Sequence, residues 1–439
     1  MERHLYHSPA AWRRAAADVG QWTLLIALLA FYVQLAAIQA AHPYGTDYAK
    51  FYYSAYQALH GQPLYTVMDA ALFNVPAAVF YQSPLVQNPS VHLPQVTAAY
   101  MPLALLPFPI SYWLWTVLSI AAGLGSCAIW WRVLYGPQAN WRVLLWMWIG
   151  LLAFYPTFTA LRLGQATMVL LLLLTVGWQQ ARSGRSKWAG VAIGLAIILR
   201  TFAALLLFYF LLKRQWRMLL WSAGTFAATV VLSLPFVGVD AYGQWLAVTG
   251  GIDWQARNWN ASLAGFFARL LPPQWGPAAL LATAACSLFW LALLTWLSWP
   301  QPQAQPQPDR RRDDLTFSLA LALMLLLSPL GWMYYFPILL IGVFVIWRQT
   351  ADGSLRALCW VLLPVWLLSN VPTEQHLAAE LTDPLGWWTW NSVYFYALII
   401  FCGLLAYLAG RGERVTKCLR NTSSPAHLVT RSDQTPPPR

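Results

Sequence analysis

The segment formed by residues 42–64 combines acidic, basic and hydroxyl groups in an otherwise strongly apolar chain. It holds one acid, Asp47, one lysine, Lys50, and five tyrosines. A carboxylate kept ionised by a nearby ammonium group accepts protons readily, which suits general-base catalysis. A structural alternative is that Thr46 caps a helix starting at Asp47, where the helix dipole favours an acid. The pattern therefore predicts that Asp47 is either a catalytic base or a structural acid in the first turn of a helix capped by Thr46.

Arg200 is a second residue suited to chemistry, because it splits two apolar runs, 188–200 and 202–213. Each run is only about 13 residues long and too short to cross a bilayer untilted, which predicts a bent, re-entrant pair with Arg200 near its outer end. An ionisable residue in such a place indicates a functional site, and a guanidinium group matches phosphate oxygens. The alternative is a membrane anchor whose side chain reaches the interface.

Membrane helices must position these residues. The chain has 439 residues, of which 59% are hydrophobic and only 10% charged, and it contains 27 tryptophans. That apolar surface exceeds what a soluble core of this size can hide. The sequence predicts an all-α polytopic membrane protein with about 12 transmembrane or re-entrant helices. The predicted runs are 22–40, 111–133, 143–158, 166–180, 188–200, 202–213, 217–235, 276–298, 315–329, 335–347, 355–370 and 391–410.

We expect one integral membrane domain over residues 1–410. Its predicted loops are a long outer loop with interfacial helices at 41–110, an outer loop at 236–275 and a proline-rich cytoplasmic linker at 299–313. Tyr48, Tyr52, Ala55 and Leu59 recur at helical spacing in the first loop, as in a helix lying on the membrane surface. Residues 411–439 are basic and are expected to form a disordered cytoplasmic tail.

Charge supports this topology. The net charge is +12, but the basic residues lie in short clusters between apolar runs, which argues against nucleic-acid binding and for cytoplasmic loops and termini in a cell membrane. A signal peptide is the competing interpretation of the first run. Either way the positive-inside rule leaves five cations on the outer side with Asp47: Lys50, Arg162, Arg200, Arg257 and Arg269. Such a group suits an anion-binding site.

Other site classes lack support. The five cysteines are scattered and contain no CxxC pair, so the sequence predicts neither a metal site nor a disulfide framework, and no cofactor motif occurs in a suitable context. His42, His92 and His376 are spread over separate outer segments, which favours interface histidines over metal ligands.

Six ordered segments carry a family resemblance. They are YGTDYAKFYYSAYQALHGQPLY, YMPLALLPFPISYWLW, LRLGQATMVLLLL, WAGVAIGLAIILRTFAALLLFYFLLKRQWR, NWNASLAGFFARLL and LLLSPLGWMYYFPILL. Together they resemble the polyprenol-phosphate-mannose-dependent mannosyltransferases of glycosyltransferase family 87, membrane enzymes of the class C (GT-C) fold. Two departures stand out. The family more often has lysine at the position of Arg200, and it usually has a histidine after SPxxW, where Met333, Tyr334 and Tyr335 stand here.

The resemblance implies an inverting hexosyl, most simply mannosyl, transferase that uses a polyprenyl-phosphate-sugar donor and a lipid or glycan acceptor at the outer membrane face. It implies Asp47 as the general base and Arg200, Arg162 and Gln165 as donor-phosphate ligands, without a metal. Further candidates for substrate contact are Lys50, Tyr48, Asn260, Arg269, Trp332, Tyr334 and Tyr335. Two alternatives stay open: a transporter or flippase of lipid-linked saccharides, and a non-catalytic homologue.

Overall fold

The computed structural model describes residues 9–83, 85–86, 88–136, 139–299, 310–350, 359–373 and 390–422, and in these ranges it consists of helices, turns and one isolated β-bridge. Five of the described helices are long and apolar enough to cross a membrane. They are α1 (Pro9–Ala41), α5 (Phe108–Tyr135), α11 (Trp216–Val237), α14 (Gly276–Ser298) and α19 (Val393–Thr422). The chain is therefore a multi-pass, all-helical membrane protein.

The predicted run 143–158 is broken rather than continuous. It forms α6 (Trp141–Leu152) and α7 (Tyr155–Arg162), which meet at an angle of 60° and count as a sixth span only if taken together. The break follows from Pro156, whose ring clashes with the carbonyl four residues earlier in a continued helix. The other described apolar helices are shorter than a full span, so the expected number of about 12 crossings is not confirmed.

The shorter helices lie between the long ones. They are α8 (Thr167–Arg182), α9 (Ser186–Leu199), η3 (Thr201–Ala204), α10 (Leu205–Leu212), α15 (Arg310–Leu326), η5 (Met333–Leu339), α16 (Leu340–Thr350) and α17 (Cys359–Ser369). As the sequence predicted, the backbone of Arg200 is extended and separates α9 from η3 and α10. Arg200 thus stands at the tip of a helix pair that is interrupted at this residue.

One end of the bundle carries three ion pairs and is called the basic end below. Arg142 of α6 pairs with Asp18 of α1 at 2.5 Å. Lys213, which follows α10, contacts Asp313 of α15 at 2.6 Å. Arg182, the last residue of α8, pairs with the adjacent Asp314. These contacts bring the ends of α8 and α10 to the same level, so the chain from α9 through Arg200 to α10 leaves this end and returns to it.

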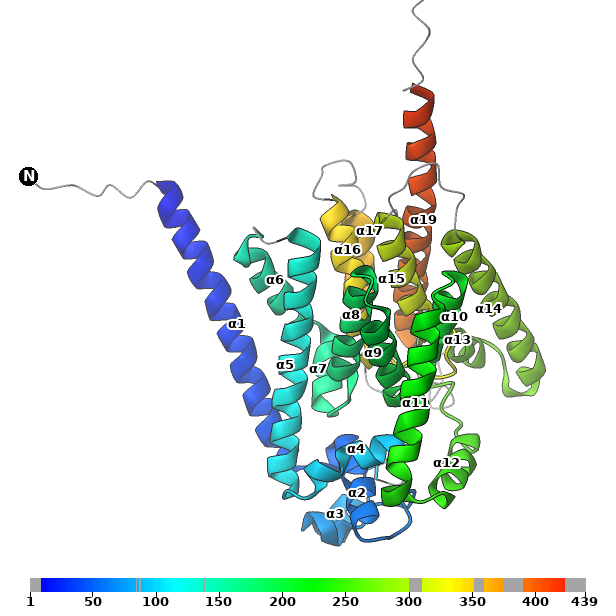
Figure 1. Cartoon of the computed structure of the whole chain (residues 1–439). Helices are drawn as coiled ribbons and strands as arrows, with labels where there is room; N and C mark the ends of the chain where they lie inside the picture. The colour runs from blue at the N-terminus through cyan, green and yellow to red at the C-terminus, as the bar shows by residue number, and fades with distance from the viewer. Residues whose placement is uncertain are drawn as a thin grey trace, which may run out of the picture.

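The opposite end carries the segment between α1 and α5, together with α12 (Asp240–Gly250) (Figure 1). This segment contains η1 (Pro43–Gly45), α2 (Tyr48–Leu59), η2 (Ala70–Phe73), α3 (Ala77–Phe80) and α4 (Pro94–Ala104). Tyr48, Tyr52 and Ala55 of α2 are buried. This face of α2 packs against α4 and α5, a burial in protein that the expectation of a helix on the membrane surface did not include. The Tyr48 ring lies 6.0 Å from that of Tyr100 and 5.4 Å from that of Tyr112.

The chain between α12 and α14 crosses over to meet the start of η5. It contains α13 (Leu263–Leu270) and η4 (Pro273–Trp275), and its residue Asn260 forms the isolated antiparallel bridge with Trp332. The amide of Ala261 donates to the carbonyl of Gly331 at 2.8 Å, and that of Met333 donates to Trp259 at 2.9 Å. A short η8 (Trp390–Ser392) then leads into α19. This bridge joins two loops at the cavity described next.

Candidate active site

Asp47 lies immediately before α2, and its carboxylate makes no helix-capping hydrogen bond. Thr46 performs that role instead, since its hydroxyl oxygen accepts from the amide of Ala49 at 3.3 Å. The Asp47 carboxylate accepts a hydrogen bond from Nε2 of Gln165 at 2.7 Å and pairs with Lys50 Nζ at 3.2 Å. The structural alternative, in which Thr46 caps the helix and Asp47 stands at its start, is therefore observed, and the Asp47 oxygens are in addition directed at side chains of a cavity.

The turn between α7 and α8 positions Gln165 opposite Asp47. The amide of Tyr48 donates to the carbonyl of Leu163 at 3.1 Å, and the Trp115 indole donates to the carbonyl of Gly164 at 2.8 Å. Gly164 has φ +65°, and a Cβ atom there would lie 2.5 Å from Cβ of Tyr48. Only glycine allows both this conformation and this approach. The turn is therefore clamped between the start of α2 and α5.

Gln165 connects Asp47 to Arg200. Its Oε1 accepts from Nη2 of Arg200 at 2.5 Å, while Nε of the same guanidinium donates to the hydroxyl of Tyr335 at 2.5 Å. The third guanidinium nitrogen, Nη1, donates to the carbonyl of Leu199 at 2.9 Å. The result is one hydrogen-bonded row, Asp47, Gln165, Arg200, Tyr335, drawn from four separate elements. It holds a carboxylate and a guanidinium group at a fixed separation.

These residues line a cavity of about 1250 Å³. Four of the five cations predicted to lie outside contribute to its wall: Lys50, Arg162, Arg200 and Arg257. Among the described residues of the wall, Asp47 is the one carboxylate. Nε of Arg162 is buried without a hydrogen-bond partner in the described chain. The cavity therefore carries excess positive charge, which suits an anionic ligand.

Three residues predicted to contact substrate, Tyr48, Asn260 and Arg269, do not line the cavity and instead bond to neighbouring segments of the chain. The Tyr48 hydroxyl lies 2.6 Å from Oγ of Ser111 and is fully buried. The Asn260 amide is used up by four backbone groups, those of Gln255, Ser262, Pro329 and Gly331. Arg269 Nη1 donates to the carbonyl of Arg257 at 2.7 Å, and burial lowers the pKa of Arg269 to about 9. Asn260 and Arg269 thus fix the loops that carry Arg257, Trp259 and Trp332, whereas Tyr48 ties α2 to α5.

The segment after SPxxW contributes aromatic side chains to the wall. Trp332 and Tyr334 stack with ring centroids 6.1 Å apart, and Tyr335 reaches Arg200. Met333 is fully buried outside the wall. Although the usual histidine is absent here, the cavity does contain imidazoles, since His42 and His92 line it. The sequence suggested that these two are interface residues and did not predict that they line the cavity. The third histidine considered, His376, lies outside the described residues.

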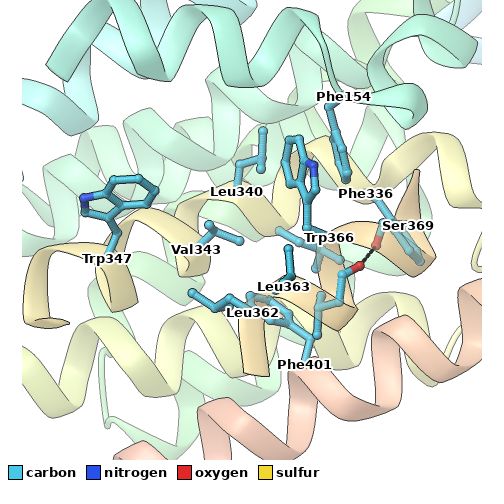
Figure 2. A pocket seen from close by; sticks show the side chains of 12 residues that line it. Phe154, Phe336, Leu340, Val343, Trp347, Leu362, Leu363, Trp366, Ser369 and Phe401 are labelled. Atoms are coloured by element: carbon cyan, nitrogen blue, oxygen red, sulfur yellow. Dashed lines mark hydrogen bonds between the residues drawn. The ribbon is translucent and has the colours of Figure 1, made fainter. Parts of the chain in front are cut away.

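A second, smaller cavity of about 230 Å³ lies between α16, α17 and α19 (Figure 2). Among the described residues its wall is apolar apart from the indole nitrogens of Trp347 and Trp366 and the hydroxyl of Ser369, which is bonded to the carbonyl of Val365 at 2.7 Å. Phe154 and Phe336 line it, while their sequence neighbours Tyr155 and Tyr335 line the large cavity. The same short stretches of chain therefore contribute to both cavities.

Fold and site together define a helical membrane protein with a cation-rich cavity around one carboxylate. The chain belongs to glycosyltransferase family 87, whose profile matches residues 92–329. It resembles a Mycolicibacterium smegmatis protein named polyprenol-phosphate-mannose-dependent alpha-(1-2)-phosphatidylinositol pentamannoside mannosyltransferase, with 30% identity over 49% of this chain and 52% of the relative. A Mycobacterium tuberculosis protein of the same name is 26% identical over 66% of this chain and 67% of the relative.

The first of these alignments spans about half the length of the relative. A longer alignment, over 83% of this chain and 84% of the relative, has 24% identity. It is to the Mycolicibacterium smegmatis polyprenol-phosphate-mannose-dependent alpha-(1-2)-phosphatidylinositol mannoside mannosyltransferase. The comparison with solved structures found no match for this chain.

Proposed function

We propose that this protein transfers a hexose, mannose in the simplest case, from a polyprenyl-phosphate-sugar donor to a lipid acceptor at the outer face of the membrane. The observation that carries the proposal is the row in which Gln165 joins Asp47 to Arg200 within one cavity. A transfer of this kind needs a base for the acceptor and a cation for the leaving phosphate. The relatives' names state a polyprenol-phosphate-mannose donor and phosphatidylinositol mannoside acceptors, which supports the same substrate classes here.

We propose the following course for the reaction. The acceptor hydroxyl oxygen attacks the anomeric carbon of the donor sugar and loses its proton to Asp47. The bond from that carbon to the phosphate oxygen breaks, and the electron pair leaves with polyprenyl phosphate. Arg200, held by Gln165 and Tyr335, stabilises the charge that grows on the phosphate. Attack from the side opposite the phosphate inverts the anomeric configuration, and one carboxylate suffices, whereas a glycosidase uses two.

The small apolar cavity suits the first part of the donor's prenyl chain. Tyr335 touches Arg200 on the large cavity, and the next residue, Phe336, lines the apolar one. A phosphate at Arg200 would therefore have an apolar space close by in which the chain can avoid water.

Substitution of Asp47 by asparagine tests the proposal. Asp47→Asn keeps the shape and can still bond Gln165, but it lacks a basic oxygen that can take up the proton. We expect transfer from a radiolabelled polyprenyl-phosphate-mannose donor in membranes to fall by about 100-fold or more, the usual range for loss of a general base. The matched control is Asp253→Asn, which changes an exposed acid beside the cavity and should keep normal turnover. Normal turnover in Asp47→Asn would contradict the assignment.

A further inference from the structure

His92 is held in a fixed orientation on the wall of the large cavity. Its ring meets that of Phe51 of α2 edge to face, with the centroids 4.1 Å apart. Its Nδ1 lies 3.2 Å from Oγ of Ser90, and its backbone carbonyl accepts from the hydroxyl of Tyr65 at 2.6 Å. Both the backbone and the ring are therefore restrained before any ligand binds.

The restraint leaves one atom of the ring without a protein partner. Because Nδ1 is bonded to Ser90, Nε2 is the second ring nitrogen, and it has no hydrogen bond within the described part of the chain. A neutral imidazole has one donor and one acceptor nitrogen, so Nε2 can still bond one polar group. The ring thus offers a single, oriented hydrogen-bonding atom at the edge of the cavity.

The charges around His92 determine which ligand group it can serve. Burial together with the positive charges of Arg200 and Lys50 holds the pKa of His92 well below its usual value, so the ring is neutral at physiological pH. A neutral ring adds nothing to the attraction for phosphate that the four cavity cations already supply. It can, however, share a hydrogen bond with a hydroxyl group.

The same two cations locate His92 relative to the reaction. Phe51, whose ring contacts His92, directly follows Lys50 in α2, and Cζ of Arg200 lies 6.0 Å from the centroid of the same Phe51 ring. Lys50 is paired with Asp47, and Arg200 is joined to Asp47 through Gln165. In the proposed reaction, the transferred sugar occupies the space between the base and the leaving phosphate. A residue close to both groups is therefore placed to contact the hydroxyl groups of that sugar.

We infer that Nε2 of His92 hydrogen-bonds a hydroxyl group of the transferred hexose and contributes to the choice of sugar. This inference rests on the proposed function and adds a specificity residue to it. A site that bonds a substrate hydroxyl discriminates strongly against analogues that lack or reorient it, since the site's own polar atom is then left unpaired. The opposing interpretation is that His92 only packs against Phe51.

Two substitutions separate these interpretations. His92→Phe keeps a flat ring against Phe51 but has no hydrogen-bonding atom, whereas His92→Gln keeps an amide that can reach a similar position. The full-length protein in lipid nanodiscs is assayed with polyprenyl-phosphate mannose and with its C2 epimer, polyprenyl-phosphate glucose. The inhibition constant of polyprenyl phosphate, which has no sugar, reports the phosphate and lipid contacts alone.

We expect His92→Phe to lower kcat/KM for the preferred donor by about 10- to 100-fold. The ratio of the kcat/KM values for the two donors should move closer to one. The inhibition constant of polyprenyl phosphate should stay within about twofold, because its contacts do not include His92. His92→Gln should recover a substantial part of the lost kcat/KM.

Three results would overturn the inference. His92→Phe with wild-type kcat/KM and donor ratio would show that no sugar contact is lost. Loss of kcat/KM in His92→Gln but not in His92→Phe would assign His92 a packing role, because only the phenylalanine keeps a ring against Phe51. If the wild type transfers hexose from neither donor, the proposed function itself fails, and this outcome is distinguished from the others because it needs no variant.

Discussion

At the scale of single residues, Gln165 changes role between sequence and structure. The resemblance implies that it binds donor phosphate, but both ends of its amide are already engaged, one by Asp47 and one by Arg200. The Gln165 amide lies between the Asp47 carboxylate and the Arg200 guanidinium group, so these two charged groups do not form a direct ion pair. We therefore propose that Gln165 is a positioning residue, which holds the proposed base and the proposed phosphate ligand at a fixed distance.

We predict that Gln165→Ala lowers kcat more than it raises the KM for donor. The variant loses two hydrogen bonds to charged groups, each worth about 1.5–3 kcal/mol, and Asp47 and Arg200 are then free to reorient. A fall in kcat of about 10- to 100-fold is expected from steady-state assays in detergent or nanodiscs.

Arg200→Ala provides the contrast, because it removes the proposed phosphate ligand and should chiefly raise the donor KM. Arg217→Ala at the basic end changes an exposed arginine far from the cavity lining and serves as the control. Equal effects of Gln165→Ala and Arg217→Ala would argue against the positioning role. An unchanged donor KM in Arg200→Ala would argue against the phosphate role.

At the scale of elements, the turn between α7 and α8 is what joins the halves of the site. It carries Arg162 and Gln165, and it is fastened to the start of α2 through Tyr48 and to α5 through Trp115. Gly164 makes that contact possible, because any side chain there would meet Tyr48. The geometry of the site therefore depends on a close approach between α2 and this turn.

We predict that Gly164→Ala reduces both thermal stability and transfer. Alanine at φ +65° costs about 1 kcal/mol from backbone strain alone, and its Cβ would also lie 2.5 Å from that of Tyr48, so the turn must move. Displacement of Gln165 by even about 1 Å is expected to lower kcat about 100-fold.

Gly184→Ala is the matched control for this change. Gly184 follows the other end of α8 with φ +73°, and a Cβ atom there would meet nothing within 4 Å. Gly184→Ala therefore has the same backbone strain as Gly164→Ala but no steric clash with another residue. We expect it to lose a little thermal stability and to keep normal transfer. Comparable loss of transfer in the two variants, measured per folded protein after size-exclusion chromatography, would count against the role of the close approach.

At the scale of the whole molecule, charge is divided between the two ends. Arg142, Arg182 and Lys213 lie at the basic end, whereas the four cations of the cavity lie toward the end formed by α2–α4. From the positive-inside rule we predict that the basic end is cytoplasmic. The proposed active site would then face outward, where the donor and a lipid acceptor would meet.

Cysteine labelling can test this orientation. In a background with all five cysteines replaced by serine and transfer retained, Gln62→Cys follows α2 and Ser183→Cys follows α8, and both positions are exposed. A membrane-impermeant maleimide applied to intact spheroplasts should label the cysteine at position 62 and reach that at position 183 only after permeabilisation. The reverse pattern would invert the topology and place the cavity on the cytoplasmic side.

Much of the fold was predictable because its signals are local. Run length and composition identify α5, α8, α11 and α14 within a few residues, and the interruption at Arg200 was also correct. The bend between α6 and α7 was missed, since a proline near the end of an apolar run permits either a kink or a helix start. The burial of α2 was missed because a tyrosine-rich face fits an aromatic protein core as well as a membrane interface.

The sequence by itself determined the class of protein, the candidate base and the candidate phosphate ligand, because apolar run length, charge bias and family motifs are read directly along the chain. Only the tertiary structure decided how these residues cooperate. Gln165 and Asp47 are 118 positions apart, and Arg200 and Tyr335 are 135 apart. Contacts over such separations depend on how helices pack. Helix packing also explains why Asn260 and Arg269, which the sequence suggested as substrate contacts, lie outside the cavity wall, and why His92 lies in it.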